Sequence, residues 1–593
     1  MTNSSSVPAQ VFAAHLLATL AKAGIRNFFL APGARSQALA IAAGQLATAG
    51  KIDLHVRLDE RSLGFTALGA ALASGEPSVI ITTSGTAVAN LHPAVLEANH
   101  SGVPLILLTA DRPHELRGVG ANQTTNQVGI FADAVRECFD VPAPNGAERE
   151  FAEAVQLAVD AIAISMGYDG DQPGPVQLNL AFREPLSALE PNAADLKPQL
   201  QLPEIFEPIP EFAMLSAELP TVVIAGAGAG DDAVELAEAF GWPLFAEPSS
   251  GARSGANVIP GYRNLLDLEG AWAELAGQIR RAIVFGKPTL GRAAIKLLFN
   301  PEVEVVVVRS PTMGHFDVSR RAGKLVDEIT VDDEVDFEWL EAWRRADAEH
   351  AAANPSSNEL DRRALVEKVW QATEGGDQLI LGASRLIREA DVWAPAKPIR
   401  VFSNRGLAGI DGTVATAAGI ALVASEGTTR VLLGDLTLLH DAGSLAIDVT
   451  EVEPNLQVIV GNDGGGSIFS SLEMAKTLDD RYQAIKELAE GVEREAPEVI
   501  LLEPQCAGSF AGTWSPRKIR ISAEDPATQK ALLLHELAHW VLESGEHGAA
   551  FYRLARSWYR WHRVGRRVAD RARPRAEPHR RGARRVARRL ADP

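Results

Sequence analysis

The fold class follows from the stretch Val431 to Thr437 (VLLGDLT), in which a short apolar strand leads into a Gly-Asp turn. A second strand, Gln457 to Val460, leads in the same way into the turn Gly461 to Gly466 (GNDGGG). Such strands, followed by small-residue turns and helices, are typical of βαβ units around a parallel sheet. Ligands of these sheets bind beyond the carboxyl ends of the strands. We therefore expect an α/β fold with a ligand site at Asp435 and Asn462.

The same alternation of strand and helix extends over most of the chain. Other predicted strands are Asn27 to Leu30, Ser78 to Thr83, Pro104 to Thr109, Thr221 to Ala225, Gln378 to Leu381 and Arg400 to Phe402. A Pro-rich linker, from about Pro185 to Pro210, and a polar stretch, Ala348 to Asn358, divide the pattern into three α/β segments. The run Gly226 to Gly230 resembles a dinucleotide loop, but such a match is weak alone, and we expect a strand-to-helix turn. After about Glu473 the alternation stops.

Composition excludes several classes of protein. The 593 residues are 46% hydrophobic and contain no apolar run long enough for a membrane span. Two cysteines, Cys138 and Cys506, cannot form a disulfide framework and suit a reducing cytoplasm. The net charge is −19, yet the tail from Arg553 to Pro593 holds fifteen Arg against three acidic residues, so the remainder carries −31. We expect the acidic body to repel nucleic acid. Only the basic tail could bind it, and that binding would not be sequence-specific.

Asp435 and Asn462 are suited to hold a magnesium ion. They lie 27 residues apart, each at the end of an apolar strand. Mg²⁺ prefers oxygen ligands and usually keeps water and phosphate oxygens among them. A carboxylate, an amide oxygen and the backbone carbonyl of Gly464 leave room for a diphosphate, which glycine backbone can approach closely.

This pair resembles the G-D-G…N-N diphosphate motif of thiamine-dependent enzymes, with Leu436 at the third position and Asp463 where several members have Asn. The resemblance implies thiamine diphosphate with Mg²⁺, or Mn²⁺, as cofactors. It also implies a glutamate that hydrogen-bonds the aminopyrimidine ring, and Glu60, after a strand and before a small-residue helix from Gly64, matches that position. The alternative is that Glu60 is only a carboxylate at the start of a helix, where the helix dipole favours a negative charge. The implied cofactor-binding residues are Glu60, Gly434, Asp435, Leu436, Thr437, Asn462, Gly464, Ile468 and Phe469.

Further motifs narrow the resemblance to one family of these enzymes. They are Ala31 to Ser36 (APGARS), Thr83 to Asn90 (TSGTAVAN), Leu108 to Pro113 (LTADRP), Gly120 to Gln123 (GANQ), Ser403 to Gly406 (SNRG) and Gly409 to Gly412 (GIDG). Together they resemble, over roughly four-fifths of the chain, the synthases of 2-succinyl-5-enolpyruvyl-6-hydroxy-3-cyclohexene-1-carboxylate. The family decarboxylates 2-oxoglutarate and adds the succinyl group to isochorismate in menaquinone biosynthesis.

Both substrates carry two carboxylates, which arginine forks bind well. The family's substrate-binding positions match Arg35, Arg112, Asn122, Gln123, Arg292, Ser384, Arg388 and Arg405, the arginines falling in predicted loops or helix starts. Ala34 departs from the family, which commonly has Ser there, so we expect weaker binding at the isochorismate end and the same reaction.

The resemblance also implies the organisation of the chain. We expect a pyrimidine-binding domain at 1–188, a central α/β domain at 205–347 and a truncated diphosphate-binding domain at 359–473. Two half-sites from different subunits imply a homodimer or homotetramer, and the expected location is the cytoplasm. The family would continue for some ninety residues beyond Glu473, so the activity of this chain is open.

The last part carries a motif of another kind. His535, Glu536 and His539 form an H-E-x-x-H on an apolar helix, which places both imidazoles on one face. With His547 they could bind Zn²⁺, and Glu536 could act as the base on its water. Residues 474–558 resemble small zincin-like metallopeptidase domains, and 559–593 form an Arg-rich tail that we expect to be disordered.

Three alternatives stay open beside the synthase. The chain could be a zinc hydrolase with the synthase part as scaffold, another thiamine-dependent carboligase, or a non-catalytic fusion. The set of arginines argues against the second.

Overall fold

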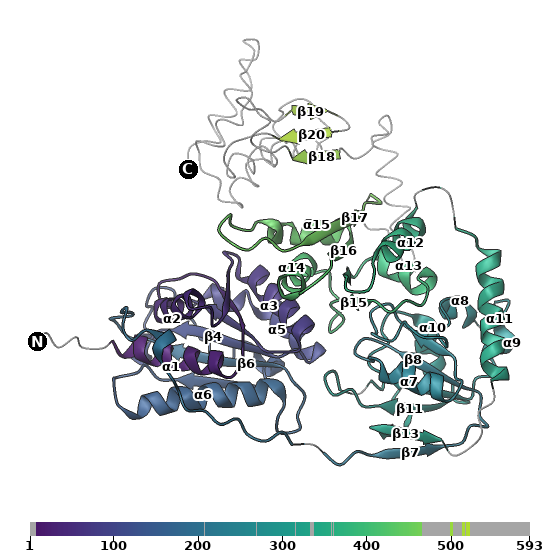
Figure 1. The fold of residues 1–593 in the computed structure, drawn as a ribbon, viewed down its shortest axis with the longest axis horizontal. Coiled ribbons are helices and arrows are strands. Elements are labelled where there is room, and N and C mark those ends of the chain that lie inside the picture. Colours follow the sequence, from purple (N-terminus) through teal and green to yellow (C-terminus); the bar gives the residue numbers. More distant parts are fainter. Residues whose placement is uncertain are drawn as a thin grey trace, which may run out of the picture. The chain divides into compact units, whose positions relative to one another are not determined.

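The structure is a computed structural model, and it describes residues 7–464 except 207, 268–269, 315, 332–336, 357–358 and 360, together with 498–501, 513–515 and 518–521. Residues 1–468 form one compact unit and residues 469–593 a second. In the first unit three α/β parts follow one another along the chain (Figure 1). None of the helices among the described residues could cross a membrane.

The first part is a six-stranded sheet in the order β2-β1-β3-β4-β6-β5, with every neighbouring pair parallel. Its strands are β1 (Asn27–Leu30), β2 (Asp53–Val56), β3 (Ser78–Thr82), β4 (Leu105–Asp111), β5 (Glu137–Val141) and β6 (Pro175–Ala181). The helical elements are α1 (Pro8–Lys22), α2 (Gln37–Thr48), α3 (Glu60–Ser74), α4 (Thr86–Ala89), α5 (His92–Ser101), α6 (Arg149–Met166), η1 (His114–Leu116), η2 (Ala132–Ala134) and η3 (Ala193–Asp195).

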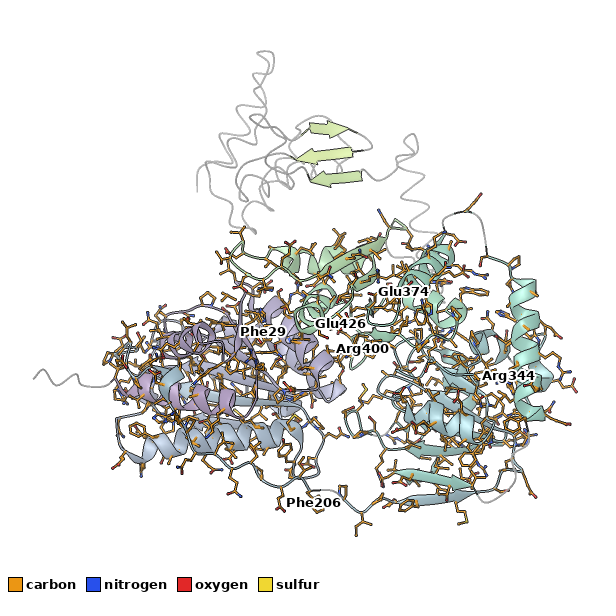
Figure 2. The ribbon with its side chains drawn as sticks, viewed as in Figure 1. Phe29, Phe206, Arg344, Glu374, Arg400 and Glu426 are labelled. Carbon is orange, nitrogen blue, oxygen red and sulfur yellow. The ribbon has the colours of Figure 1, made fainter. Side chains whose placement is uncertain are left out.

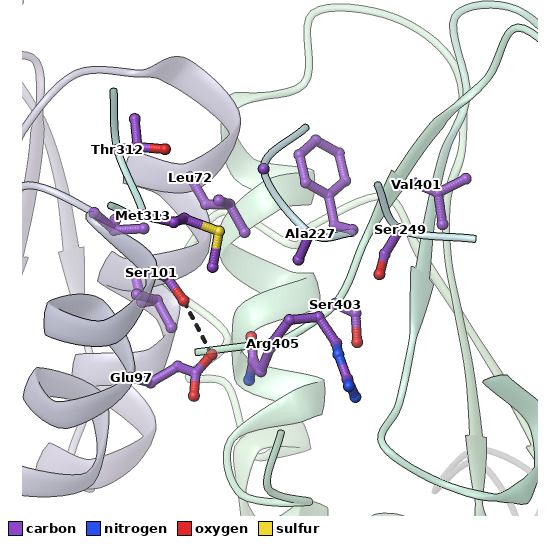
Figure 3. Close-up of a pocket in the computed structure, with 15 residues that line it drawn as sticks. Leu72, Glu97, Ser101, Ala227, Ser249, Thr312, Met313, Val401, Ser403 and Arg405 are labelled. Carbon is purple, nitrogen blue, oxygen red and sulfur yellow. Dashed lines mark hydrogen bonds between the residues drawn. The ribbon is translucent and has the colours of Figure 1, made fainter. Parts of the chain in front are cut away.

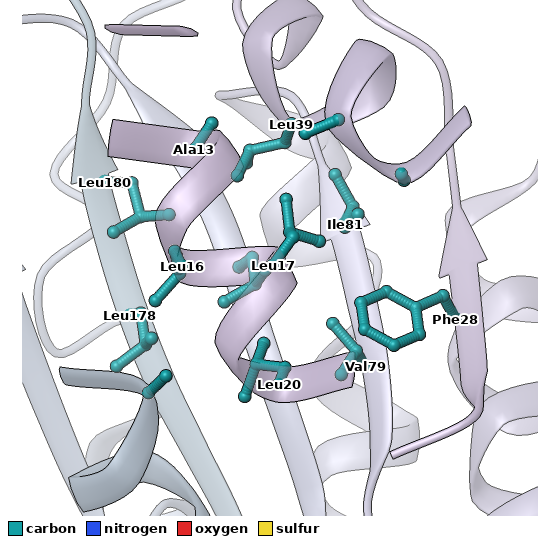
Figure 4. Close-up of a cluster of buried hydrophobic side chains, with 14 of the residues drawn as sticks. Ala13, Leu16, Leu17, Leu20, Phe28, Leu39, Val79, Ile81, Leu178 and Leu180 are labelled. Atoms are coloured by element: carbon teal, nitrogen blue, oxygen red, sulfur yellow. The ribbon is translucent and has the colours of Figure 1, made fainter. Parts of the chain in front are cut away.

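Helices cover both faces of this sheet. On one face α1, α2 and α6 pack on the strands, and Figure 4 shows Leu16 of α1 beside Leu178 and Leu180 of β6, with Leu17 toward Val79 and Ile81 of β3. On the other face α3 and α5 form a second cluster. Each fully buried Leu or Phe contributes about 1.5–3 kcal/mol to folding. The all-apolar strands that suggested a parallel sheet are therefore buried on both faces.

The second part is a five-stranded parallel sheet in the order β12-β11-β10-β8-β9, beside the two-stranded pair β13-β7. Its strands are β7 (Phe212–Leu215), β8 (Thr221–Ala225), β9 (Leu244–Ala246), β10 (Arg281–Phe285), β11 (Glu304–Val308), β12 (Ala322–Val326) and β13 (Glu328–Val331). Its helices are α7 (Asp232–Ala239), α8 (Tyr262–Leu265), α9 (Ala273–Ala276), α10 (Arg292–Phe299) and α11 (Glu338–Ala353). The run Gly226 to Gly230 joins β8 to α7, as the sequence predicts.

The third part is a four-stranded parallel sheet in the order β15-β14-β16-β17. Its elements are α12 (Arg362–Ala372), β14 (Gln378–Leu381), α13 (Arg385–Trp393), β15 (Arg400–Phe402), α14 (Thr413–Val423), β16 (Thr429–Gly434), α15 (Asp435–Asp441), η4 (Ala442–Leu445) and β17 (Leu456–Gly461). The parallel α/β class that the sequence predicts is thus confirmed.

The described residues of the second unit form one small sheet. Its strands are β18 (Glu498–Leu501), β19 (Thr513–Ser515) and β20 (Lys518–Ile521), with β20 parallel to β18 and antiparallel to β19. Val499 lies in β18 and Ile519 in β20, and the two are register partners.

The first and third parts meet along helices α3 and α14. An added Cβ at Gly69 would lie 2.0 Å from the backbone O of Thr416, and one at Gly419 would lie 1.9 Å from that of Thr66. The two helices therefore touch backbone to backbone. Arg400, labelled in Figure 2, adds a hydrogen bond of 2.9 Å to the backbone O of Ala73 at the end of α3.

The segment between the first two parts has the irregular course that its prolines predict. It contains the short turn η3 and otherwise no helix or strand from 182 to 211 in the residues described. Phe206, labelled in Figure 2, is mostly exposed, and its backbone N–H donates to the O of Tyr168 at 2.7 Å.

Candidate functional site

The strand ends of β16 and β17 bring the two predicted magnesium ligands together. The strands are parallel neighbours, and Gly434 is the register partner of Gly461. Asp435 and Asn462 come directly after these two residues, so both follow adjacent strands at the same edge of the sheet. This juxtaposition is what the sequence spacing predicts.

Asp435 is the first residue of α15, so the strand runs directly into a helix where we expected a loop. Its Oδ1 accepts a hydrogen bond of 2.8 Å from the N–H of Leu436, and no Lys or Arg of the described residues forms an ion pair with it. Its charge is therefore available to a cation. Thr437 is buried behind it, whereas Leu436 is 40% exposed.

A tight turn follows β17. The Oδ1 of Asn462 accepts from the N–H of Gly464 at 3.1 Å, and Gly464 has a φ of 83°, which favours glycine. Asp463 points to another partner, Arg362, at 2.7 Å. Ile468 and Phe469, the predicted apolar wall, lie outside the described residues.

Glu60 is held at the start of α3. Asp59 caps the helix by accepting from the N–H groups of Arg61 and Ser62 at 3.0 and 3.4 Å. The side-chain amide of Asn90 donates to Oε2 of Glu60 at 3.2 Å. Glu60 is half-buried, and the amide of Asn90 contacts only one of its two carboxyl oxygens.

The residue after Glu60 ties α3 to the cofactor-binding part of the predicted site. Arg61 donates to Asp411 and, at 2.9 Å, to the buried Asp441, the last residue of α15. Asp441 also accepts from the N–H groups of Val414 and Ala415 at the start of α14, at 2.7 and 3.0 Å. One carboxylate thus joins the ends of three helices.

Two of the predicted substrate arginines lie together beyond β1 and β4. Arg35 donates to the backbone O of Phe182 at 3.1 Å, and Arg112 donates to the hydroxyl of Ser84. Burial, and then the charge of Arg112, lower the pKa of Arg35. The two guanidinium groups are therefore close enough to repel each other, and an anion bound between them would relieve that repulsion.

The polar loop next to these arginines is fixed by Ser84. Its hydroxyl donates to the O of Gln123 at 2.8 Å, and the amide of Gln123 donates to the O of Ser84 at 2.9 Å. Asn122, Gln123 and Ala34 are exposed at this place. Ser84 and Asn90 belong to the family motif Thr83 to Asn90, but the sequence alone gives neither of them a role. Their roles become clear only from their contacts.

The other predicted substrate residues lie between the second and third parts. Arg292 opens α10, Ser384 caps α13 by accepting from the N–H of Leu386 at 3.2 Å, and Arg388 lies one turn inside that helix. Arg405 is buried and follows β15. The pKa of Arg388 is lowered by burial and then by neighbouring arginines, Arg405 and Arg292 among them, so these cations share one region.

Arg405 also lines a cavity of about 120 Å³ (Figure 3). On its other side the carboxylate of Glu97 accepts from Ser101 at 3.2 Å and from the N–H groups of Gly406 and Leu407 at 2.7 and 2.9 Å. These bonds hold the loop that carries Arg405.

The predicted zinc ligands His535, His539 and His547, with Glu536, lie outside the described residues. Within the described ranges no group of three or more His, Cys, Asp or Glu could hold a metal ion. A metal at Asp435 would therefore depend on amide, carbonyl and ligand oxygens for most of its coordination.

Comparison with known proteins identifies the relatives of this chain. The family of the thiamine pyrophosphate enzyme N-terminal TPP binding domain matches residues 11–130. The 2-succinyl-5-enolpyruvyl-6-hydroxy-3-cyclohexene-1-carboxylate synthase of Leifsonia xyli subsp. xyli is 47% identical, covering 79% of this chain and 87% of its own length. Synthases of the same name from Kineococcus radiotolerans and Clavibacter michiganensis subsp. michiganensis are 45% and 43% identical, each over 80% of this chain and over 86% and 90% of their own lengths.

Proposed function

The chain belongs to the family of 2-succinyl-5-enolpyruvyl-6-hydroxy-3-cyclohexene-1-carboxylate synthases, and on that premise we propose that it joins the succinyl group of 2-oxoglutarate to isochorismate. It is a thiamine-diphosphate enzyme of the transferase class and takes part in menaquinone biosynthesis. The observation that carries the proposal is the register match of Gly434 with Gly461, because it aligns Asp435 with Asn462.

We propose that Asp435, Asn462 and the backbone O of Gly464 hold Mg²⁺ and, through it, the diphosphate of the cofactor. The unpaired carboxylate and the glycine turns of this edge fit an ion with phosphate oxygens in its shell. When bound, thiamine diphosphate would supply a carbon nucleophile for the ketone carbon of the 2-oxoacid and an electron sink for the loss of its carboxylate as CO₂.

Glu60 is our proposed proton-holding group. Its Oε2 is already oriented by the amide of Asn90, and its position at the capped end of α3 is rigid. Such a carboxyl can donate a hydrogen bond to a ring nitrogen and take the proton back. Asn90 is then a positioning residue for Glu60.

The two groups of arginines suit two substrates that each carry two carboxylates. Arg35 and Arg112, with Gln123 and Asn122, form one positively charged, anion-binding pocket at the predicted isochorismate end. Arg292, Arg388 and Arg405, with Ser384, form the other. Forked guanidinium groups bind and orient carboxylates, and orientation lowers the barrier by sparing entropy in the transition state.

The test is turnover of the purified chain. With 2-oxoglutarate, isochorismate, Mg²⁺ and thiamine diphosphate, we expect isochorismate to be consumed and CO₂ released. Glu60→Gln should reduce this rate by at least about 100-fold, the scale of general acid–base catalysis, while cofactor affinity changes little. Wild-type protein that binds cofactor without turnover contradicts the proposed activity, and an active Glu60→Gln variant contradicts the role of Glu60.

We also propose that two or more copies assemble, in the cytoplasm. The support is a set of large aliphatic side chains that are exposed before α3, on α15 and η4, and between η4 and β17. They are Leu58, Leu436, Leu439, Leu445, Val449 and Val452. Monomeric proteins rarely expose such groups together. Light scattering on the purified protein should give the mass of a dimer or tetramer, and a monomer mass would contradict this.

A further inference from the structure

The turn Thr289 to Gly291, which leads from β10 into α10, is a meeting point of the second arginine group. Arg405 donates from Nη2 to the hydroxyl of Thr289 at 2.5 Å. Arg388 donates from Nη1 to the backbone O of Leu290 at 3.1 Å. Arg292 is the residue that follows the turn and opens α10. The position of this turn therefore sets the spacing of three guanidinium groups.

A buried carboxyl group holds the turn from beneath. Glu247 directly follows β9 and is 2% exposed. Its Oε1 accepts from the N–H of Leu290 at 2.6 Å, and it also accepts from the N–H of Gly291. The backbone N–H of Glu247 donates to the O of Ala225 at 2.8 Å, which anchors the residue to β8. The sheet thus fixes the turn through a single side chain.

The surroundings of Glu247 make this contact structurally demanding. Its other oxygen, Oε2, is buried and has no hydrogen-bond partner among the described residues. Burial and the neighbouring Asp391 raise the pKa of Glu247, whereas the charge of Arg405 lowers it. Asp391 is itself held by the hydroxyl of Tyr262 at 2.8 Å and by Arg263 at 3.5 Å. The carboxyl group is therefore kept in place chiefly by the two backbone donors.

The arginines above the turn repel one another, and burial strengthens that repulsion. Without a rigid turn they would be expected to separate toward solvent. We propose that Glu247 is a positioning residue of the synthase, holding the turn Thr289 to Gly291 so that Arg292, Arg388 and Arg405 converge on one dicarboxylate ligand. This inference rests on the proposed function for the identity of the ligand.

Two substitutions separate hydrogen bonding from charge and bulk. Glu247→Gln keeps the acceptor oxygen, whereas Glu247→Met fills the same space without it. Glu304→Met is the matched control, because Glu304 begins β11 of the same sheet and pairs with Arg281 at 2.8 Å, apart from these arginines. Thr289 is exposed, so Thr289→Val tests the same turn without risk to the core.

The probe is 2-hydroxyglutarate, which has the two carboxylates of 2-oxoglutarate and no ketone to react, titrated into protein loaded with Mg²⁺ and thiamine diphosphate. We expect Glu247→Met to raise the Kd of the probe at least about 10-fold and Thr289→Val several-fold. Glu247→Gln and Glu304→Met should stay within about threefold of wild type, and the Kd of thiamine diphosphate should not change. In turnover, Glu247→Met should raise KM for 2-oxoglutarate more than it lowers kcat.

An unchanged probe affinity in Glu247→Met and Thr289→Val would overturn the positioning role, as would Glu247→Gln weakening the probe as much as Glu247→Met. Should Glu247→Met not fold, the comparison of Thr289→Val and Glu247→Gln decides. If the wild-type protein binds the probe but does not catalyse carboligation, only the proposed function is contradicted. The titration still measures the role of Glu247 in that case.

Discussion

The crossing of α3 and α14 gives the sharpest prediction about stability. In Gly69→Ala the new Cβ would lie 2.0 Å from the backbone O of Thr416. Carbon–oxygen contacts need about 3.3 Å or more, so the helices must separate by roughly 1.3 Å. The obstacle is backbone and cannot rotate away. Overpacking of this kind costs about 1–3 kcal/mol, and here we expect the upper end, about 3 kcal/mol.

Gly44→Ala is the matched control. Gly44 also lies inside a helix, α2, but a Cβ there would meet nothing within 4 Å. It should stabilise the protein by about 0.5–1 kcal/mol, because alanine loses less entropy than glycine in a helix. The same chemical change is thus predicted to have opposite signs at two sites.

Thermal unfolding with a calorimeter measures both effects. If the first unit unfolds together, unfolding entropies of about 2.1 cal/mol/K per residue convert 1 kcal/mol into about 1 °C. Gly69→Ala should therefore lower Tm by about 3 °C and Gly44→Ala should raise it slightly. Because α3 begins at Glu60, Gly69→Ala should also slow carboligation. Equal Tm values for Gly69→Ala and wild type would refute the backbone contact.

Three further predictions follow from single side chains. Asp441→Ala should lower the free energy of unfolding in urea by about 3 kcal/mol, because it leaves buried N–H donors and Arg61 without their acceptor. Asp53→Ala, which removes an exposed ion pair, should lower it by less than about 1 kcal/mol. Similar losses in the two variants would contradict this prediction. The pKa of Glu247 is raised from 4.5 to about 8, so the folded state keeps a proton that the unfolded chain releases, and stability should fall as pH rises from about 4.5 to 8. Glu247→Gln should flatten the dependence of stability on pH over this range. An unaltered slope would argue against a protonated Glu247 in the folded state. His535→Ala should lower the zinc content measured by metal analysis if the H-E-x-x-H motif binds zinc, and equal zinc in both proteins would remove that site.

Local pattern was sufficient to predict strands such as β1, β8 and β16 and the alignment of Asp435 with Asn462 at one edge of the sheet, but it did not single out β2, β5, β6, β7 or β9 to β13. Apolar runs such as Asn27 to Leu30 can be buried only between two helical layers, and parallel strands place their carboxyl ends at one edge. The direct passage from β16 into α15 was not predictable, because a Gly-Asp pair serves equally well as a turn or as a helix start.

The supporting contacts could not be predicted from the sequence. Glu247 follows a short strand and is followed by Pro248, a pattern typical of an exposed loop. Its burial results from packing against the turn at 289–291 and against α13, which come 40 residues and more later in the chain. Asp441 likewise resembles a surface residue at a helix end until its donors from α3 and α14 are known.

The close contact between α3 and α14 has a consequence for biosynthesis. Gly69 and Gly419 are separated by 350 residues, so the ribosome must add that length before α3 can find its partner. At about 5–20 residues per second this takes roughly 20 to 70 s. During that time the face of α3 that later packs on α14 stays uncovered in the nascent chain. Newly made protein should therefore depend on chaperones, or on slow translation, more than its parallel sheets alone would require.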